Sequence, residues 1–383
     1  MTEVDVTERA LLVTRNFPPL VGGMERVNQH LLIELARGWR VSLCGPSGCA
    51  ALAPEAANVV ETPLRPLPRF LLGCAWRAWR MARRERPRLV IAGSGLAAPM
   101  AWLAARASRA RLVVYLHGLD IIAPSLIYQH LWLPFIRACD QVLVNSENTG
   151  RLARERGVAA DRISVLHPGT DVPELDSAAG QAFRVKHGLG QRRLLLSVGR
   201  FTRRKGLAEF VRRALPAIVV GHPDALLLVI GEEAHDALHG ASGSERSRIE
   251  RLAREARVES HVRFLGCCDE ATLHAAYQAA DCHVFPVLDL PGDVEGFGMV
   301  AVESAAHGLR TVAFAVGGVP DAVDAGRTGD LVAPGDYSAF AEAVVAQLGL
   351  PPSAERLSTC RRFAEGKSWE RFGERLRTIL SAS

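Results

Sequence analysis

Short apolar runs alternate with longer stretches of helical period along the whole chain. Alternation of this kind is typical of βα units, which build parallel sheets. The strands predicted in the first half are Leu11–Thr14, Val41–Cys44, Leu89–Ala92, Leu112–Leu116, Val142–Asn145 and Ile163–Leu166. The pattern then restarts, and the strands predicted in the second half are Leu194–Val198, Ala225–Ile230, Val262–Leu265, Cys282–Phe285, Thr311–Phe314 and Asp330–Val332. Two such series predict an α/β protein with two doubly wound parallel sheets.

We therefore expect two Rossmann-like domains facing a cleft, since ligands of such sheets bind outside the carboxyl ends of the strands. The first domain is predicted at residues 1–172 and the second at residues 182–365. Between them Asp171–Gln181, in which proline and glycine break any period, reads as a linker. Residues 366–383 include the amphipathic stretch Trp369–Leu380, which we expect to form a terminal helix that could dock back on the first domain.

The composition adds one feature to this picture, an uneven distribution of charge. Of the 383 residues 48% are hydrophobic and 23% are charged, as in ordinary globular proteins. Residues 1–170 hold 21 arginines and no lysine against 13 acidic residues, a formal charge of +8, whereas the remainder holds 25 basic and 28 acidic residues, a charge of −3. A basic first half indicates an anionic partner, such as a membrane surface, a nucleic acid or a phosphorylated acceptor.

Eight cysteines are spread along the chain without a Cys-x-x-Cys pair. We expect them to be reduced core residues rather than disulfides or zinc ligands. The N-terminus lacks the apolar region of a signal peptide, and no uncharged apolar run is long enough to span a membrane. The sequence therefore predicts a cytoplasmic protein, whose membrane contact, at the inner face of the plasma membrane, would be peripheral.

One glycine-rich stretch carries the strongest candidate chemistry. Gly296 and Gly298 flank Phe297, and a helix-forming run follows. Glycine-rich backbone at a helix N-terminus exposes N–H groups and suits an anion such as a diphosphate. Glu295 precedes this helix and Glu303 lies about 12 Å further along it, roughly the distance between the sugar and the ribose of a sugar nucleotide. On their own, two acids at a helix start are as readily explained by capping or solvation.

Five motif regions along the chain make a family resemblance specific. They are Asn16–Glu25, His167–Asp171, Ser197–Gly206, Glu295–Glu303, and the pair Gly317–Asp321 and Thr328–Asp336. In this order they resemble the retaining glycosyltransferases of family four, whose GT-B fold has two Rossmann-like domains. The resemblance covers nearly the whole chain and looks closest to bacterial GDP-mannose-dependent mannosyltransferases. It implies a hexosyltransferase that takes its sugar from a nucleotide-diphosphate donor.

The resemblance also implies roles for the residues that match its motifs. Arg200 and Lys205 would hold the donor diphosphate, the arginine as a fork and the lysine as a point charge. Gly22 and Gly23 would let backbone N–H groups approach the same phosphates. Further donor contacts would come from Gly296, Phe297 and Gly298.

Three more residues would contact the sugar and the ribose of the donor. His117, which follows a predicted strand, would lie beside the sugar and hydrogen-bond a hydroxyl or the developing charge. Glu295 would contact the sugar hydroxyls and Glu303 the ribose. With Arg200 and Lys205, His117 and Glu295 form the predicted catalytic set. Taken alone, each of these residues is also compatible with a structural role.

No metal and no other cofactor are expected. An Asp-x-Asp pair, which holds the metal ion in the other common glycosyltransferase fold, does not occur in the chain. Arg200, Lys205 and a helix N-terminus would replace the cation electrostatically. The resemblance implies retention at the anomeric carbon by front-side attack, in which the donor phosphate accepts the acceptor's proton. The residues themselves indicate only the phosphate clamp, since no carboxylate is placed as an obvious nucleophile.

The same likeness suggests GDP-mannose as donor and a lipid-linked or polysaccharide acceptor in cell-envelope glycan synthesis, of lipopolysaccharide or exopolysaccharide. The alternative is a UDP-sugar-dependent transferase of the same fold that acts on a small soluble acceptor, because UDP-sugar enzymes share most of the pattern.

A basic segment indicates where an anionic acceptor or surface could be met. Arg65–Arg88 holds eight arginines and one acid. At helical spacing one face of it would carry Leu72, Ala75, Trp76, Trp79 and Ala82. Such a helix could lie on an anionic membrane surface, or it could cover the sheet and bury both tryptophans.

Other classes of protein fit the sequence less well. Nucleotide-sugar epimerases share the two-domain plan but lack the segment Glu295–Glu303. We expect no nucleic-acid partner, because no helix-turn-helix or finger pattern occurs and few aromatic residues stand among the arginines. A non-catalytic binding protein is disfavoured by the intact motifs. An NAD enzyme, suggested by Ala92–Ala98, would need an acidic residue about 20 positions further on, after a new strand.

Overall fold

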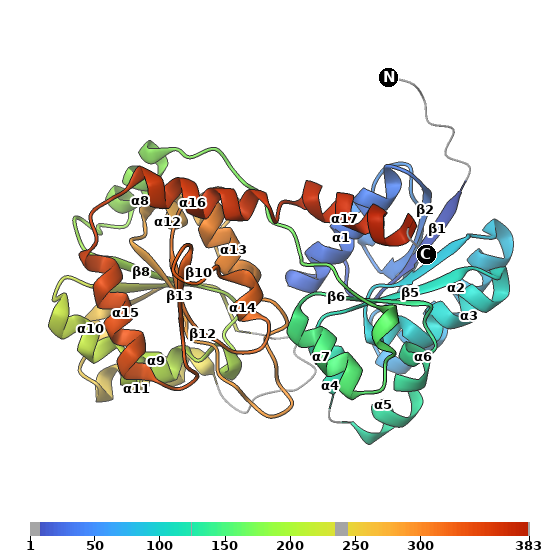
Figure 1. The fold of residues 1–383 in the computed structure, drawn as a ribbon, viewed down its shortest axis with the longest axis horizontal. Helices are drawn as coiled ribbons and strands as arrows, with labels where there is room; N and C mark the ends of the chain where they lie inside the picture. The colour runs from blue at the N-terminus through green and yellow to red at the C-terminus, as the bar shows by residue number, and fades with distance from the viewer. Residues whose placement is uncertain (1–7, 124, 234–243, 382–383) are drawn as a thin grey trace. The chain divides into compact units, whose positions relative to one another are not determined.

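The computed structural model describes residues 8–123, 125–233 and 244–381. The described residues of Met1–Gly169 and Trp369–Ser383 form one compact unit, and those of Thr170–Ser368 form the other (Figure 1). The chain thus crosses from the first unit to the second after Gly169 and returns after Ser368.

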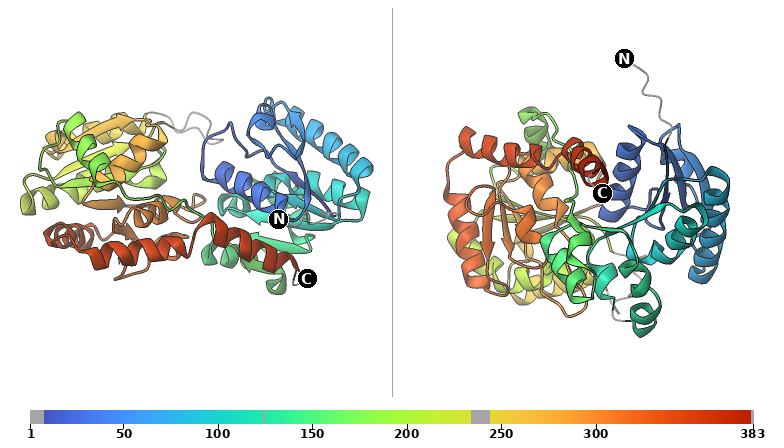
Figure 2. Two further views of the ribbon diagram at one scale, coloured as in Figure 1. Left: turned by 90° about the horizontal axis from the view of Figure 1, so that it is seen from above. Right: turned by 45° about the vertical axis from the view of Figure 1, so that its right-hand side comes forward.

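The first unit is built on a sheet of seven parallel strands in the order β3-β2-β1-β4-β5-β6-β7. Its strands are β1 (Arg9–Val13), β2 (Arg40–Pro46), β3 (Asn58–Thr62), β4 (Leu89–Ala92), β5 (Arg111–Leu116), β6 (Gln141–Val144) and β7 (Ile163–Val165). Every residue of β4 and β6 is buried, because helices cover both faces of the sheet (Figure 2). The sequence prediction missed β3, a half-exposed edge strand with polar ends and too short an apolar run to be recognised.

Helices connect these strands. They are α1 (Gly23–Ala36), α2 (Leu67–Glu85), α3 (Ala98–Ser108), α4 (Leu119–Ile122), α5 (Leu126–Leu131), α6 (Leu133–Arg137), α7 (Glu147–Glu155) and α17 (Trp369–Ser381), with 3-10 turns at Cys49–Leu52, Gly95–Ala97 and Ala160–Arg162. Helix α17 comes from the far end of the chain and packs on α1 (Figure 1). The ring of Trp369 stacks on His30 with centroids 3.8 Å apart, and Arg377 Nη1 lies 3.0 Å from Oε2 of the buried Glu34.

The second unit has a sheet of six parallel strands in the order β10-β9-β8-β11-β12-β13. The strands are β8 (Leu194–Val198), β9 (Leu226–Ile230), β10 (Val262–Gly266), β11 (Cys282–Phe285), β12 (Thr311–Phe314) and β13 (Gly329–Val332). The helices are α8 (Ser177–Lys186), α9 (Leu207–Arg213), α10 (Leu215–Gly221), α11 (Glu245–Glu255), α12 (Glu270–Ala279), α13 (Met299–Ala306), α14 (Val319–Ala322), α15 (Tyr337–Gly349) and α16 (Ala354–Glu365), with 3-10 turns at Arg203–Lys205 and Glu259–His261. The predicted fold class, two doubly wound parallel α/β sheets, is confirmed.

Each sheet has one place where the strand order reverses. In the first unit the chain builds outward from β1 to β3 and then returns to place β4 on the other side of β1. In the second unit β8 and β11 stand in the same relation. The loops diverge at such a switch point and leave a crevice outside the carboxyl ends of the strands, where ligands of this architecture bind.

The predicted linker Asp171–Gln181 is longer than the connection that the structure has. Helix α8 begins at Ser177, and Asp176 caps it by accepting a hydrogen bond from the backbone N–H of Ala178. The glycine expected to break the period, Gly180, lies inside this helix and packs on the backbone of Gln278. The sequence analysis interpreted Gly180 as part of a loop, whereas in the structure its small size allows α8 to pack closely on α12.

Helix α2 departs from both interpretations of its sequence. It does cover the sheet, through a face of Phe70, Cys74, Ala78, Met81 and Ala82. The tryptophans are nevertheless not buried, since Trp76 is 54% exposed and Trp79 is 41% exposed, and Leu72 beside them is 75% exposed. The helix therefore has an apolar face toward the sheet and a second, outward face of tryptophan and arginine.

The cysteines are all free, and six of the eight are buried. The expectation of core residues was wrong for Cys267, which is exposed, and for Cys268, which is half-buried, because both follow the end of β10 in a loop. Across the described ranges, none of the helices has the length and apolar character needed to cross a bilayer.

Candidate functional site

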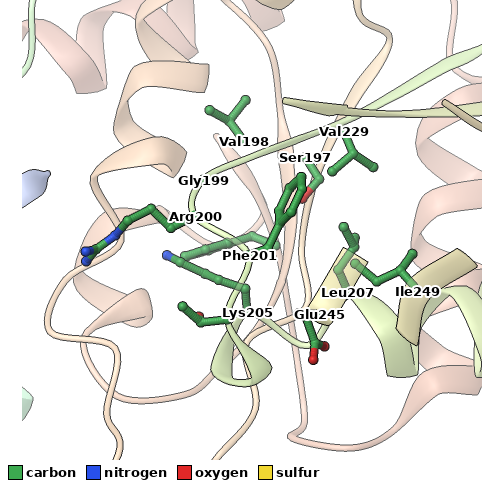
Figure 3. A pocket seen from close by; sticks show the side chains of 12 residues that line it. Ser197, Val198, Gly199, Arg200, Phe201, Lys205, Leu207, Val229, Glu245 and Ile249 are labelled. Carbon is green, nitrogen blue, oxygen red and sulfur yellow. The ribbon is translucent and has the colours of Figure 1, made fainter. Parts of the chain in front are cut away.

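A pocket lies at the switch point of the second unit, at the carboxyl ends of β8 and β11. Its walls include the loop Ser197–Thr202, Lys205 and Phe285, and together with the open space at its mouth it holds about 350 Å³. Arg200 and Lys205 extend to the same side of the pocket, and Leu207 and Ile249 stand on the other (Figure 3). The predicted phosphate loop therefore lies where this architecture binds ligands.

The turn that presents Lys205 depends on Gly206. This residue has a φ of +69°, and a Cβ atom there would lie 1.9 Å from the carbonyl oxygen of Pro286. Only glycine combines that conformation with so close an approach of two backbones. The turn is also held by Leu288, whose backbone N–H donates to the carbonyl of Arg204 at 2.8 Å. Lys205 thus sits on a backbone fixed against the loop that follows β11.

The predicted stretch from Glu295 to Gly298 leads into α13, with Gly298 at the N-cap in a left-handed conformation. A second glycine pair, Gly317 and Gly318, packs against the backbone of this loop. The backbone N–H of Gly318 donates to the carbonyl of Glu295 at 2.9 Å, and a Cβ atom on Gly318 would lie 2.0 Å from the carbonyl oxygen of Gly296. Two motifs that are distant in sequence therefore form one packed unit at the N-terminus of α13.

Glu295 forms ion pairs with two cations, Arg204 and Lys205. Its Oε2 accepts hydrogen bonds from Arg204 Nη1 and from Lys205 Nζ, the latter at 2.8 Å. Burial disfavours the charge of this side chain, but the attraction of Arg204 and Lys205 outweighs burial and lowers the pKa of Glu295 to about 2. The carboxylate is therefore ionised at neutral pH, and neither bond uses Oε1.

Arg204 is the residue of this group that the sequence analysis missed. Its side chain is 11% exposed, and its Nε lies 2.8 Å from Asp293 Oδ1. Burial disfavours the guanidinium charge, yet Glu295 and Asp293 together raise the pKa of Arg204. The sequence shows two acids at positions 293 and 295 and a basic run at 203–205, but their pairing is visible only in the structure.

Arg200, in contrast, is exposed and forms no ion pair with any described residue of the chain. Lys205 Nζ also lies over the ring of Phe285, 4.8 Å from its centroid. Burial lowers the pKa of Lys205 more than the nearby Glu295 raises it. The pocket thus combines one uncommitted guanidinium with an ammonium group shared between a carboxylate and an aromatic face.

Glu303 lies just over one turn into α13, nearer to the helix start than the sequence suggested. Its Oε2 accepts a hydrogen bond from Tyr277 Oη at 3.3 Å. On the next turn His307 stacks on Tyr277 with ring centroids 4.8 Å apart and donates from Nδ1 to the carbonyl of Glu303. Burial lowers the pKa of His307 to about 4, so this histidine is a neutral packing residue.

Gly22 and Gly23 lie in the first unit, where Gly22 is the N-cap and Gly23 the first residue of α1. Space is limited, since a Cβ atom on Gly22 would lie 2.4 Å from Oε2 of Glu25. The other oxygen of Glu25 accepts a hydrogen bond from Asn16 Nδ2 at 2.8 Å. The buried side chains of Glu25 and Asn16 therefore hold the glycine-rich loop in place. The loop ends at the N-terminus of α1, where backbone N–H groups can bind an anion.

His117 follows the last residue of β5 and is buried. Its Nε2 lies 2.9 Å from the carbonyl oxygen of Gly93, which can only accept, so Nε2 carries the proton. In the neutral ring Nδ1 is then an acceptor. The backbone N–H of His117 donates to Asp120 Oδ1, and the other carboxylate oxygen of Asp120 accepts from the backbone N–H of Gly95, both at 2.9 Å. Sequence analysis missed Asp120, whose only signal is its place three residues after the histidine.

The predicted site residues thus fall into two groups. The second unit brings Arg200, Lys205, Glu295, the glycines around Phe297 and Glu303 to one switch point. The first unit holds Gly22, Gly23 and His117 at the carboxyl edge of its own sheet. Across the described ranges, no three or more histidine, cysteine or acidic side chains are grouped so that they could hold a metal ion.

Two family models match the chain. Residues 21–174 match the model described as Glycosyltransferase Family 4, and residues 181–362 match Glycosyl transferases group 1. A GDP-mannose-dependent alpha-(1-6)-phosphatidylinositol monomannoside mannosyltransferase of Mycolicibacterium smegmatis is 30% identical over 390 residues, covering 97% of this chain and 98% of the relative. The chain belongs to the glycosyltransferases of family 4. The resemblance drawn from the five motif regions and the prediction of a hexosyltransferase are confirmed.

Further relatives of this glycosyltransferase differ in what they make. A glycogen synthase of Mycobacterium tuberculosis is 28% identical, with 92% of this chain and 89% of the relative covered. Among solved structures, Anabaena HepE in complex with UDP-glucose covers 98% of this chain and 100% of its own, with a TM-score of 0.78 at 19% identity. That likeness shows the GT-B fold, as expected from the sequence.

Proposed function

We propose that this glycosyltransferase moves a hexose, with retention of configuration, from a nucleotide-diphosphate sugar to a lipid-linked or polysaccharide acceptor in cell-envelope glycan synthesis. The observation that carries the proposal is the grouping of Arg200, Lys205 and Glu295 beside the N-terminus of α13. Two cations and a helix N-terminus suit a diphosphate, and a carboxylate accepts hydrogen bonds from sugar hydroxyls.

In this proposal the enzyme works chiefly on the leaving group. As the bond between the anomeric carbon and the phosphate oxygen breaks, negative charge grows on the diphosphate, and Arg200, Lys205 and the α13 N-terminus stabilise it. The acceptor oxygen attacks from the same face, and the departing phosphate takes its proton. These cations do the electrostatic work that a metal ion does in other transferases, so we expect the reaction to need none.

His117 and Glu295 would bind the donor sugar. With Nε2 donating to Gly93, His117 presents Nδ1 as an acceptor for a sugar hydroxyl. Glu295 keeps Oε1 for a second hydroxyl while Oε2 stays with Arg204. His117 is buried, Glu295 is 12% exposed, and each is held by hydrogen bonds within its own unit, as the orientation of a flexible donor requires.

GDP-mannose is the donor that we propose first, because the mannosyltransferase from M. smegmatis matches nearly the whole chain. The alternative is a UDP-sugar donor with a small soluble acceptor. It is favoured by a D-inositol 3-phosphate glycosyltransferase of Catenulispora acidiphila that is 32% identical over 225 residues, although this match covers 56% of the chain.

Release of nucleotide from purified protein tests the donor. GDP-mannose, UDP-glucose and UDP-N-acetylglucosamine are each incubated with the enzyme, with and without EDTA, and free GDP or UDP and the melting temperature are measured. We expect turnover of GDP-mannose, unchanged by EDTA, and a higher melting temperature with GDP. When an acceptor is added, proton NMR of the new glycoside reports retention or inversion. No response to any of these donors or nucleotides would refute the transferase proposal, and loss of turnover in EDTA would refute metal independence.

The outward face of α2 supports a peripheral contact with an anionic membrane, at the inner face of the plasma membrane in a cytoplasmic enzyme. Arg80 lies over the ring of Trp76 and Arg83 over that of Trp79, at 5.3 and 5.4 Å from the ring centroids. Neither arginine forms an ion pair with a described residue. Exposed tryptophan flanked by unpaired arginine is the composition of interfacial helices on anionic lipid.

Flotation with vesicles tests this contact. Wild type is expected to float with vesicles of phosphatidylcholine and phosphatidylglycerol, and Arg80→Glu/Arg83→Glu is expected to stay in the soluble fraction. The control Arg212→Glu/Arg254→Glu makes the same change of charge on exposed helix positions of the second unit and should float like wild type. Equal behaviour of all three proteins would remove the membrane contact.

A further inference from the structure

Lys205 and Arg204 are consecutive residues that share one carboxylate oxygen, Oε2 of Glu295. The three side chains are 22%, 11% and 12% exposed, so water screens their attraction little. Arg204 also pairs with a second acid, Asp293, so the two cations that share this oxygen are not equivalent. When an anion binds in the pocket, the cation that is held less firmly is the one expected to leave Glu295.

Two nitrogens of the Arg204 guanidinium are paired with acids, and the backbone of this residue is hydrogen-bonded as well. Its Nη1 donates to Glu295, its Nε faces Asp293 at 2.8 Å, and its carbonyl accepts from Leu288. Arg200 and Lys205 line the pocket, whereas Arg204 is not among the residues that line it. Arg204 is therefore placed to hold the loop 293–295 and not to bind a ligand itself.

Lys205 is held much more loosely. Glu295 is its one ion-pair partner within the described residues, and its second contact is the ring of Phe285. Its ammonium group faces the same pocket as Arg200 (Figure 3). If Lys205 moves to an anion, Glu295 keeps Arg204 and is not left as an unpaired buried charge, which is the expensive outcome.

We propose that Arg204 is a positioning residue that neutralises Glu295 and thereby releases Lys205 to bind the donor diphosphate. This inference rests on the proposed nucleotide-diphosphate donor. Without Arg204, Glu295 would have only Lys205, and a diphosphate would have to compete with a buried carboxylate for that lysine. A diphosphate carries more negative charge than a monophosphate, so we expect its binding to depend more on a free Lys205.

Calorimetric binding of GDP and GMP, or of UDP and UMP if wild type prefers uridine, tests this role. Arg204→Met should weaken binding of the diphosphate about tenfold or more, the effect of one charge-assisted hydrogen bond, with a smaller change for the monophosphate. Arg204→Lys, which keeps a cation beside Glu295, should recover part of the loss. The control Arg203→Met removes the exposed neighbouring charge and should bind like wild type.

A double variant separates release of Lys205 from direct binding by Arg204. In Arg204→Met/Glu295→Gln the competing carboxylate charge is gone, so Lys205 is free again and diphosphate affinity should return toward that of wild type. The double variant also leaves no unpaired buried carboxylate, so it keeps the test available if Arg204→Met does not fold.

The outcomes are distinct. A double variant as weak as Arg204→Met would overturn the inference, because it would show that Arg204 itself contacts the diphosphate. Equal affinities for Arg204→Met and Arg203→Met would overturn it as well, since Arg204 would then have no influence on the donor. Wild-type protein that binds neither GDP nor UDP would instead remove the proposed donor, whatever the variants do.

Discussion

Asp120 orders two loops of the first unit with a single carboxylate. Its two oxygens accept from the backbone N–H groups of His117 and Gly95, one beyond β5 and one beyond β4. Asp120→Asn replaces one acceptor by a donor, so one of these N–H groups is left facing another donor, at a cost of about 1–3 kcal/mol. Because His117 is displaced with its loop, we expect kcat to fall roughly tenfold or more.

The matched control is Asp140→Asn. Asp140 contacts the start of β5, whereas Asp120 contacts the loop beyond its end. Asp140 Oδ2 accepts from the backbone N–H of Leu112 at 2.7 Å, and an asparagine can keep this one bond through its amide oxygen, so the control removes a charge away from the proposed site without leaving an N–H facing a donor. Steady-state kinetics and thermal melts of both variants make the comparison. We expect only Asp120→Asn to lose stability and kcat; equal kcat values would show that Asp120 has no part in positioning His117.

At this scale the sequence indicated residues that belong to a motif and did not indicate one that stands outside any recognised role. Glu295 and Lys205 were found through their neighbours in the chain, and the structure brings them into contact. Arg204, the second cation on Glu295, stands in a run of three basic residues, where the sequence does not show which side chain turns inward. Selection among the three is made by Asp293 and Glu295, some 90 residues later.

The loop before α13 packs on the loop that precedes α14, and this packing requires a residue without a side chain at Gly318. A Cβ atom on Gly318 would lie 2.0 Å from the carbonyl oxygen of Gly296, and backbone cannot yield as a flexible side chain does. Gly318→Ala must therefore push the loop 293–298 away, with a loss of stability of about 1–3 kcal/mol or more. Because Glu295 moves with this loop, we expect donor KM to rise about tenfold or more.

Gly349→Ala is the control for that change. Gly349 ends α15, and a Cβ atom there would meet no atom within 4 Å. This variant should keep the KM of wild type and its melting temperature within a few degrees, since an alanine that fits costs little. Donor kinetics and melting curves compare the two. A Gly318→Ala enzyme with the KM of wild type would show that the two loops are not coupled.

Strands and helices were predictable from hydrophobic pattern where both faces are buried, as in β4, β6, β11 and β12. The pattern was less informative at the edge and the surface. Strand β3 was missed because its half-exposed residues give only a weak apolar signal. In α2 the period showed an apolar helix but placed the tryptophans and Ala82 on one face, whereas Ala82 is buried and both tryptophans are exposed.

At the scale of the whole molecule, the last helix belongs to the unit that the chain builds first. Arg111 Nη1 donates to the carbonyl of Leu380 at 2.7 Å, and Arg375 Nε donates to that of Val165 at 3.1 Å. Leu376 is fully buried in this packing. The stability of the first unit therefore depends on a segment some 200 positions further along the chain, the amphipathic stretch for which the sequence suggested docking on the first domain.

Two equivalent substitutions in different units test this dependence. Leu376→Ala removes buried side-chain volume from α17 and Leu348→Ala removes the same volume from α15, and each should cost about 2–5 kcal/mol. A protein of two units need not unfold in one step, so calorimetry should show Leu376→Ala lowering one transition and Leu348→Ala another. Because the proposed donor loop lies in the second unit, GDP should raise the transition that Leu348→Ala lowers. If both variants lowered the same transition equally, the units would unfold as one, and the stability of the first could not be attributed to α17.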